Sequence, residues 1–340
     1  MQPTPLLTRQ GCLVELVRTM YAKLILRIST TSVAASLFGA VGWVAISPVD
    51  GASAGQDSAH VRPAPAWTPP TWHPAGEDLW ALEQMAGTAL ESAPRLRSSA
   101  AYVFDVDQGE VLLEHNADTI QPVASLTKLV SALALTSSDY DLDREICIGA
   151  EHYPTRNGAF SKLSTGDCIE GWDALGAALV SSDNRGAFAL ASATDLDLDG
   201  FIQRMNTVSG QLGMDMSSWT DPSGLEDENM STARDLARAT MAVATHPLLS
   251  TVSSAPHWDL HYDDRPVRRR FTTNKLSGRK DLGIDAVKTG YTGTAGYCYT
   301  TALTTRTGRH VVITLLGARR DRDRYRDVSS LLNWIDGLEA

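Results

Sequence analysis

The sequence predicts an α+β fold in which one antiparallel sheet of about five strands is flanked by helices, with a helical lobe packed beside it. Two observations predict this class. Strand-like segments occur near both ends of the folded region, at residues 100–115 and 282–318, and a long section with helical periodicity lies between them. Because short turns connect successive strands, the strands should pair antiparallel. We expect the first and last helices to cover the sheet.

The individual elements follow in chain order. AAYVFDV and EVLLEH, separated by Asp107-Gln108-Gly109, predict a hairpin with a glycine in its turn. The segment PVASLTKLVSALAL, residues 122–135, has apolar residues at helical spacing and predicts a helix. Further helices are predicted at residues 172–180, 185–193, 200–212 and 232–245. The last strands and the final helix are predicted at residues 282–288, 297–305, 310–318 and 322–338.

The N-terminal region has the pattern of an export signal. An uncharged apolar stretch at residues 30–46 follows several basic residues and precedes the small-residue segment Ala52-Ser53-Ala54. We interpret residues 1–54 as a signal peptide, with Met20 as an alternative start. An uncleaved membrane anchor is the alternative, because the apolar stretch is nearly long enough to span a bilayer. Residues 55–78, rich in proline and alanine, predict a linker, and residues 79–340 form the folded domain.

Charge and cysteine usage restrict the partners. The formal net charge of −10 argues against nucleic acid, and we interpret the cluster Arg268-Arg269-Arg270 as a solvated strand or loop. Cys147 and Cys168 lie in short strand-like runs that can pair as a ribbon. A disulfide between them is expected in an oxidising compartment, and two free thiols are the alternative. Cys298 is expected to be an unpaired, buried strand residue.

Metal and cofactor signals are weak. The cysteine and histidine spacings do not resemble a zinc site. Residues 195–200 begin like a calcium loop, but Asn206 stands where the bidentate glutamate should be. We therefore expect a capped turn at this point, no metal and no cofactor.

One lysine does not fit its surroundings. Lys128 lies among apolar residues on the helix predicted at 122–135, one turn after Ser125. At this spacing the two side chains share a helix face and reach each other. Burial among leucine and valine favours the neutral amine, and the nearby helix start favours a forming alkoxide. We interpret Lys128 as the base that activates Ser125, although S-x-x-K alone is a weak signal.

Two further motifs strengthen this interpretation. Ser182-Asp183-Asn184 follows an apolar helical run, and Lys288-Thr289-Gly290 ends a predicted strand. S-x-x-K, S-D-N and K-T-G together are typical of class A β-lactamases and penicillin-binding proteins. From about residue 100 to residue 337 the chain resembles low-molecular-mass penicillin-binding proteins of the D-alanyl-D-alanine carboxypeptidase family, and the stretch DPSGL also matches. Within that family it is most similar to the periplasmic endopeptidases of the penicillin-binding protein seven type.

The resemblance implies a β-lactamase/transpeptidase-like fold and a catalytic role for each motif. Ser125 would attack the carbonyl after a D-alanine, Lys128 would accept its proton, and water would hydrolyse the acyl-enzyme. Ser182 would relay a proton to the leaving amine. Asn184 would hold Lys128 and the substrate backbone.

The third motif would bind the substrate. Lys288 and Thr289 would bind its carboxylate or the corresponding part of an amide, and Gly290 would let the strand approach it. The backbone N–H groups of Tyr291 and Ser125 would form the oxyanion hole. The charge of Lys288 is also expected to push Lys128 toward neutrality.

The predicted function is a serine DD-peptidase that cleaves crosslinks between peptidoglycan stem peptides and is acylated by β-lactam antibiotics. We expect it in the periplasm, with membrane attachment only through an uncleaved N-terminal anchor. Three alternatives stay open. The first is a carboxypeptidase that trims terminal D-alanine. The second is a class A-like β-lactamase, which would need a general base, and no acidic residue stands out for that role. The third is a non-catalytic wall-binding scaffold, which would not need the intact Ser125 and Lys128.

Overall fold

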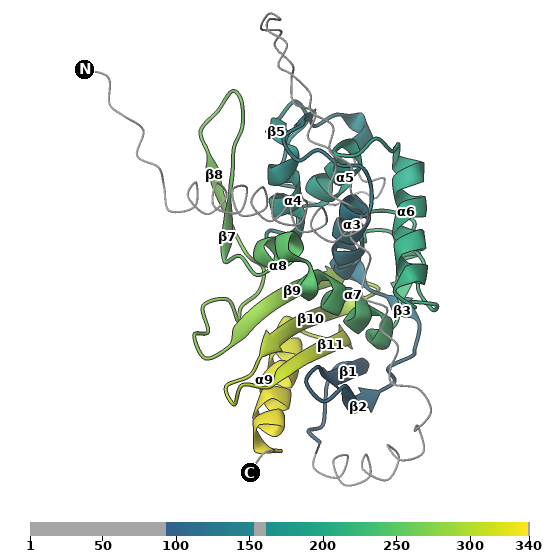
Figure 1. Ribbon diagram of the computed structural model, residues 1–340, viewed down its shortest axis with the longest axis vertical. Helices are drawn as coiled ribbons and strands as arrows, with labels where there is room; N and C mark the ends of the chain where they lie inside the picture. The colour runs from purple at the N-terminus through teal and green to yellow at the C-terminus, as the bar shows by residue number, and fades with distance from the viewer. Residues whose placement is uncertain (1–92, 153–160, 339–340) are drawn as a thin grey trace, which may run out of the picture. The chain divides into compact units, whose positions relative to one another are not determined.

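The computed structural model describes residues 93–152 and 161–338. Its central element is a five-stranded antiparallel sheet with the strand order β2-β1-β11-β10-β9 (Figure 1). The strands are β1 (Ala100–Asp105), β2 (Glu110–His115), β9 (Gly283–Thr292), β10 (Gly296–Thr304) and β11 (His310–Ala318). The predicted α+β class is confirmed. The predicted signal segment and linker, residues 1–78, lie outside the described residues.

The sheet joins the two ends of the folded region. β1 pairs with β11 from Ala100 opposite Leu316 onward, so the first strand lies beside the last. The β1–β2 hairpin turns at Gly109 with φ of 68°, which a glycine adopts readily. β9 is one of the two edge strands and carries the K-T-G motif. The sheet therefore places this motif where a partner can approach it.

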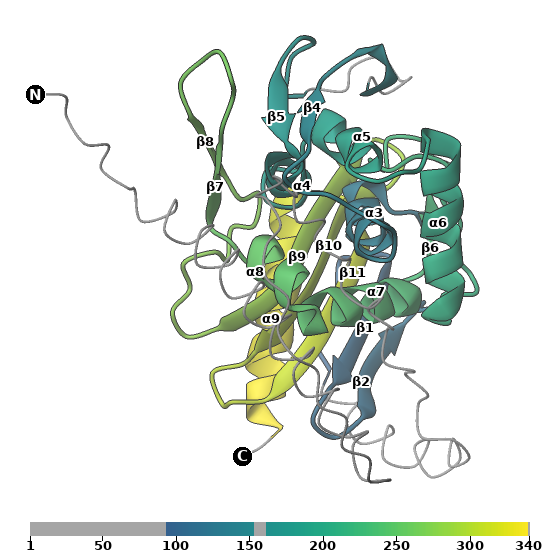
Figure 2. The ribbon, with the colours of Figure 1, turned by 45° about the horizontal axis from the view of Figure 1, so that its top comes forward.

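Helices pack on both faces of the sheet (Figure 2). The helices are α3 (Thr127–Thr136), α4 (Gly171–Leu179), α5 (Asn184–Ser192), α6 (Leu198–Gln211), α7 (Ala233–Thr245), α8 (Pro247–Ser253) and α9 (Asp321–Gly337). α9 covers one face, whereas α7 and α8 cover the other. The expectation that the first helix covers the sheet is wrong. Every residue of α3 is buried, because this helix forms the centre of the lobe and packs against α4, α5, α6 and α7.

The last helix closes the core beneath the sheet. Val328, Leu331 and Ile335 of α9 are fully buried in a cluster with apolar side chains of β1, β10 and β11. Full burial of one such side chain stabilises a fold by ~1.5–3 kcal/mol. Asp327, also buried, accepts hydrogen bonds from the Arg97 and Ser98 backbone nitrogens at 2.9 and 2.8 Å and from Ser98 Oγ at 2.8 Å. These bonds tie the segment before β1 to α9.

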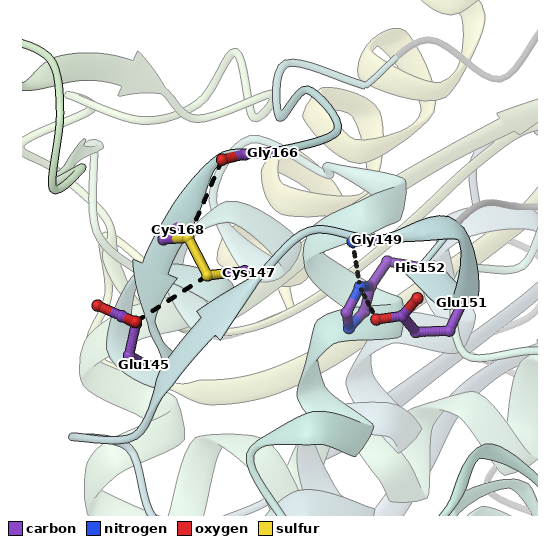
Figure 3. The surroundings of a disulfide bond; sticks show 7 residues. All are labelled: Glu145, Cys147, Gly149, Glu151, His152, Gly166 and Cys168. Carbon is purple, nitrogen blue, oxygen red and sulfur yellow. Dashed lines mark hydrogen bonds and ion pairs between the residues drawn. A yellow bond between two sulfur atoms is a disulfide. The ribbon is translucent and has the colours of Figure 1, made fainter.

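Three two-stranded ribbons complete the described structure. They are β3–β6 (Gln121–Pro122, Met230–Ser231), β4–β5 (Glu145–Cys147, Cys168–Glu170) and β7–β8 (His257–Leu260, Arg268–Phe271). Cys147 and Cys168 face each other in the β4–β5 ribbon and form a disulfide (Figure 3). Cys298 is buried in β10 and is the free cysteine of the described residues. The cysteine pairing expected from the strand-like runs is thus present.

The calcium-like sequence is a helix start. Asp197 caps α6, with its side chain accepting a hydrogen bond from the Gly200 backbone nitrogen at 2.8 Å. The capped turn expected at this position is confirmed. Within the part of the chain that the structure describes, no helix combines the length and apolar character needed to cross a membrane.

Candidate active site

Ser125 lies in a tight turn that is held from two sides. The turn is a 3₁₀ segment, Ala124–Leu126, that leads directly into α3. Gly290 of β9 packs against it so closely that a Cβ there would lie 3.1 Å from the Ser125 backbone nitrogen. Gly224 packs against the other side with φ of 78°, and a Cβ there would overlap the Ala124 carbonyl. The absence of side chains at these two glycines therefore sets the position of Ser125.

Lys128 is fully buried and surrounded by oxygen atoms. Its Nζ donates hydrogen bonds to Ser125 Oγ at 2.9 Å, to Asn184 Oδ1 at 2.9 Å and to the Ser223 carbonyl at 2.6 Å. An ammonium has three N–H donors, which match these three acceptors. A neutral amine keeps two donors for Asn184 and Ser223 and turns its lone pair to the Ser125 hydroxyl. The same geometry therefore accommodates both protonation states of the lysine.

The surroundings of Lys128 favour the neutral amine. Burial lowers the pKa of Lys128 to about 8, and the negative charges of Asp221 and Asp183 oppose this shift. A buried ammonium loses its hydration, and desolvation disfavours the charged form of a lysine. A pKa near the working pH is what an efficient proton acceptor needs.

The S-D-N motif forms the turn between α4 and α5. Ser182 has φ of 58°, an uncommon value for a residue with a side chain, and its Oγ accepts a hydrogen bond from Lys288 Nζ at 2.8 Å. Asp183 caps α5 by accepting a hydrogen bond from the Gly186 backbone nitrogen at 3.1 Å. Asn184, the first residue of α5, directs its side-chain oxygen at Lys128. The α5 start thus presents two side chains of the motif to the two lysines.

Lys288 is almost completely buried, at 2% exposure, and its Nζ also donates to the Thr289 carbonyl at 3.1 Å. Burial is the main cause that lowers the pKa of Lys288, followed by the charge of Lys128. Burial is likewise the largest cause that lowers the pKa of Lys128. Because repulsion between two ammonium groups acts on both of them, the expectation that Lys288 pushes Lys128 toward neutrality stays a prediction.

A polar cavity of about 310 Å³ opens in front of these side chains. Its lining combines groups from the lobe, the sheet edge and α9: Ser125, Ser182, Asn184, Leu225, Thr273, Thr289, Gly290, Tyr291, Thr292 and Arg324. Six of the eight residues predicted for catalysis or substrate binding line it, and the other two, Lys128 and Lys288, lie behind Ser125 and Ser182. A smaller, apolar cavity of about 40 Å³ under α7 contains none of them. The predicted residues therefore converge on one cavity.

The sheet side of this cavity is held by side-chain contacts. Thr289 Oγ1 lies 2.6 Å from Thr273 Oγ1 in the segment after β8. Tyr291 is exposed by 56% and stacks on Tyr297, with ring centroids 4.2 Å apart. β9 thus offers both a small polar side chain and an exposed aromatic ring at the cavity.

The sequence interpretation missed the loop that holds Lys128 from behind. Asp221 is buried and accepts hydrogen bonds from the backbone nitrogens of Ser223, Gly224 and Glu226 at 2.6, 3.0 and 3.0 Å. These bonds shape the loop that points the Ser223 carbonyl at Lys128. The stretch DPSGL carried the only sequence signal for this loop, and a backbone carbonyl leaves no mark in a sequence.

Arg324 was also missed. It lies in the first turns of α9, is only 7% exposed and lines the cavity. Its Nη1 donates to the carbonyls of Gly290 and Cys298 at 2.9 and 2.8 Å. These bonds fix a positive charge beneath the K-T-G strand. In the sequence, Arg324 is one of several arginines between residues 319 and 326 and has no distinguishing spacing.

Comparison with known proteins identifies the family of the chain. Residues 87–320 match the family described as D-alanyl-D-alanine carboxypeptidase. A D-alanyl-D-alanine endopeptidase of Pseudomonas aeruginosa is 34% identical over 252 residues, which cover 74% of this chain and 80% of that protein. The D-alanyl-D-alanine carboxypeptidase DacC of Escherichia coli is 29% identical over 268 residues, covering 75% of this chain and 65% of that protein.

A solved structure shares the fold. A penicillin-binding protein of Listeria monocytogenes, crystallised in a cefotaxime-bound form, superposes with a TM-score of 0.62 at 29% identity. The match covers 71% of this chain and 98% of that one. The fold, the convergence of three motifs on one cavity and the family match lead to the same conclusion: the chain belongs to the D-alanyl-D-alanine carboxypeptidase family of serine DD-peptidases.

Proposed function

We propose that this protein is a D-alanyl-D-alanine endopeptidase that cleaves peptidoglycan crosslinks through an acyl-enzyme at Ser125. One observation carries the proposal more than any other. The Nζ atom of a fully buried lysine, Lys128, lies 2.9 Å from Ser125 Oγ, and burial lowers the pKa of this lysine to about 8. A serine hydroxyl is a weak nucleophile and needs such a base.

Acylation begins with proton transfer from Ser125 to neutral Lys128. The Ser125 oxygen forms a bond to the carbonyl carbon after a D-alanine, and the carbonyl oxygen becomes negatively charged. The backbone N–H groups of Ser125 and Tyr291 stabilise this charge, and one such donor is worth about 3 kcal/mol of barrier. The closeness of Gly290 to the Ser125 nitrogen supports this assignment, because it brings β9 beside that N–H group.

The leaving amine takes its proton from Ser182. The carbon–nitrogen bond then breaks, and the acyl group stays on Ser125. Lys288 Nζ, 2.8 Å from Ser182 Oγ, connects this hydroxyl to a second buried amine. The proton that Lys128 took from Ser125 replaces the one that Ser182 gave away, so Lys128 is neutral again. Water then attacks the ester, and Lys128 takes a proton from that water and passes it to the departing Ser125 oxygen. Asn184 holds Lys128 in place throughout, since its Oδ1 accepts a hydrogen bond from Nζ.

The cavity favours a negatively charged substrate group. Arg324 brings positive charge to the K-T-G strand of a protein whose net charge is −10, and Lys288 adds a second charge when it is protonated. A carboxylate next to Thr289 would accept a hydrogen bond from the Thr289 hydroxyl and would favour the protonated form of Lys288. The protein's own groups disfavour that form, because burial and the charge of Lys128 lower the pKa of Lys288. Substrate binding should therefore be coupled to proton uptake by Lys288.

Sequence identity favours crosslink cleavage over trimming of terminal D-alanine. The Pseudomonas endopeptidase is 34% identical to this chain, and the Escherichia coli carboxypeptidase is 29% identical. Trimming of terminal D-alanine is the second candidate, since the family description itself names a carboxypeptidase.

We also place the protein outside the cytoplasm, in the periplasm. The export-type pattern at residues 1–54 and the Cys147–Cys168 disulfide support this location, because disulfides persist in oxidising compartments. Its partners are then peptidoglycan stem peptides and β-lactam antibiotics, which would acylate Ser125. The N-terminal segment would provide any attachment to the membrane.

Digestion of purified muropeptides tests this function. Crosslinked dimers and uncrosslinked pentapeptide monomers are incubated with the protein, and the product masses are recorded. Conversion of dimers to monomers identifies an endopeptidase, whereas loss of one alanine from monomers identifies a carboxypeptidase. Ser125→Ala should abolish both reactions and also labelling by a fluorescent penicillin.

The same preparation separates the remaining alternatives. Rapid turnover of a chromogenic cephalosporin would indicate a β-lactamase. If the protein cleaved no muropeptide and a fluorescent penicillin never labelled Ser125, the wall-binding scaffold would be the better account.

A further inference from the structure

We propose that Lys162 and Arg270 form an anion subsite on the leaving-group side of Ser125, and that it binds a carboxylate of the second stem peptide in a crosslinked substrate. The proposal rests on the endopeptidase function proposed above. It assigns crosslink recognition to two residues outside the three catalytic motifs.

Hydrogen bonds between side chains and backbone place both residues beside the S-D-N turn. The Lys162 backbone nitrogen donates to Asp183 Oδ2 at 2.6 Å, one residue from Ser182. Arg270 of β8 donates from Nη2 to the Lys162 carbonyl at 3.5 Å. Three residues after Arg270, Thr273 lines the cavity and contacts Thr289. The ribbon that carries Arg270 therefore continues directly into the cavity wall.

The fold holds this ribbon in place. β7 packs against α4, the helix that precedes the S-D-N turn, and the β7–β8 ribbon rises beside α4 in both ribbon views (Figures 1 and 2). Trp258 of β7 is buried, donates from its ring nitrogen to Asp173 of α4 at 2.8 Å and pairs across the ribbon with Arg270. Arg270 is thus carried on a strand that is fixed to the lobe.

Neither cation has an anionic partner among the described residues. Arg269 pairs with Asp259, and Arg265 pairs with Asp167, but Lys162 and Arg270 form no ion pair there. The buried Nε of Arg270 has no hydrogen-bond partner in the same part of the chain. Charged side chains are rarely buried without a partner, and the side chains of Lys162 and Arg270 are both partly buried.

The nearest carboxylate is already committed. Asp183 accepts hydrogen bonds from Ser161 Oγ at 2.6 Å, from the Lys162 backbone nitrogen at 2.6 Å and from the Gly186 backbone nitrogen at 3.1 Å. Burial, as the largest cause, lowers the pKa of the Lys162 side chain; the charge of Asp183 opposes this shift, and that of Arg270 adds to it. The charge of Lys162 in turn lowers the pKa of Lys288. A bound anion would relieve the repulsion among these cations.

The position of Lys162 and Arg270 indicates that they contact the leaving group of the substrate. In the proposed reaction Ser182 protonates the leaving amine, and Lys162 and Arg270 lie next to the turn that carries Ser182. A carboxypeptidase expels a single D-alanine, whose carboxylate ends at Lys288 and Thr289. An endopeptidase expels a whole second stem peptide, which continues past these residues and carries further carboxylates. Lys162 and Arg270 would therefore contact the leaving group only when the substrate is a crosslink.

Paired substrates test this inference. The values of kcat/KM are measured for a crosslinked muropeptide dimer and for a single pentapeptide stem, together with the rate of acylation by a fluorescent penicillin. Arg270→Met and Lys162→Met should each lower kcat/KM for the dimer about tenfold, as expected for one lost charge-assisted contact. Penicillin acylation and cleavage of the single stem should change by less than about twofold.

Arg268→Met is the matched control, because Arg268 lies on the same face of β8, is exposed and has no ion pair among the described residues. It should leave dimer cleavage unchanged. In a second arm, amidation of the second stem's carboxylates should slow the wild type about tenfold and should add little to the effect of Arg270→Met.

Three results would overturn the subsite: equal losses on dimer and single stem, an equal loss in Arg268→Met, or full additivity of amidation and Arg270→Met. Failure of the wild type to cleave dimers while penicillin still acylates it would instead refute the endopeptidase function itself. The penicillin arm also shows that each variant is folded.

Discussion

The rate of acylation at Ser125 should rise with pH as Lys128 loses its proton. Burial lowers the pKa of Lys128 to about 8, from 10.5 for the unperturbed side chain. Only the neutral amine accepts the Ser125 proton in the proposed mechanism. Its fraction is roughly one tenth at one pH unit below the pKa, half at the pKa and roughly nine tenths at one unit above it. The acylation rate should therefore increase about tenfold between about pH 7 and about pH 9.

The assay is the second-order rate constant for acylation by a fluorescent penicillin, measured across this range. Asp221→Asn should move the midpoint to lower pH, because the Asp221 charge raises the pKa of Lys128. Asp183→Asn is a second variant with the same expected direction, since its charge also raises this pKa. A flat profile, a midpoint near that of an exposed lysine, or a shift to higher pH in both variants would refute the assignment of Lys128 as the base.

The same pKa also predicts how stability depends on pH. Between about pH 8 and pH 10.5 the unfolded chain keeps the Lys128 proton that the folded chain has lost. The unfolded state then binds more protons, so the free energy of unfolding rises with pH in this window, by roughly 3 kcal/mol from this group. Lys128→Met lacks this contribution. In denaturant unfolding, the free energy of unfolding of the wild type should rise relative to that of the variant across this pH window. A constant difference between the two free energies would contradict the shifted pKa.

Other predictions concern structural supports of the site. Replacing Cys147 and Cys168 by serine should lower the free energy of unfolding by about 3 kcal/mol, because the bridge joins residues 21 apart; thermal unfolding with and without reductant checks this. Asp327→Ala should cost about 2–4 kcal/mol in denaturant unfolding, since its carboxylate accepts hydrogen bonds from the segment before β1; a loss under about 0.5 kcal/mol would contradict this. Gly224→Ala should abolish penicillin acylation, because its Cβ would displace the Ser125 turn, and a wild-type rate would exclude that role.

Local patterns were sufficient for the elements of the sheet and for the motifs. The β1–β2 hairpin depends on alternating residues and a glycine at the turn, both of which are local properties. S-x-x-K places Ser125 and Lys128 on one helix face because the helical period is fixed. The short ribbons β3–β6 and β7–β8 were not predicted, since two to four residues carry too little periodicity to be recognised.

The placement of α3 shows the limit of such patterns. The sequence of this helix is apolar on most sides, which is equally consistent with covering a sheet or with a position inside a lobe. The structure places α3 at the lobe centre, and α7 covers the sheet in its stead. Contacts between distant segments decide between these arrangements, and no local pattern reports them.

The sequence alone was enough to indicate a serine nucleophile with a lysine base. Three motifs occur in the order that is typical of penicillin-binding proteins, and the residues of each motif have a chemical role in the proposed reaction. Folding decided how that lysine behaves. Its burial sets the pKa, and the Ser223 carbonyl, shaped by Asp221, supplies its third acceptor. Arg324 reaches the cavity only through tertiary packing, and Lys162 and Arg270 reach the S-D-N turn in the same way. Desolvation and long-range charge depend on distances in space, and residues far apart in a sequence acquire those distances only when the chain folds.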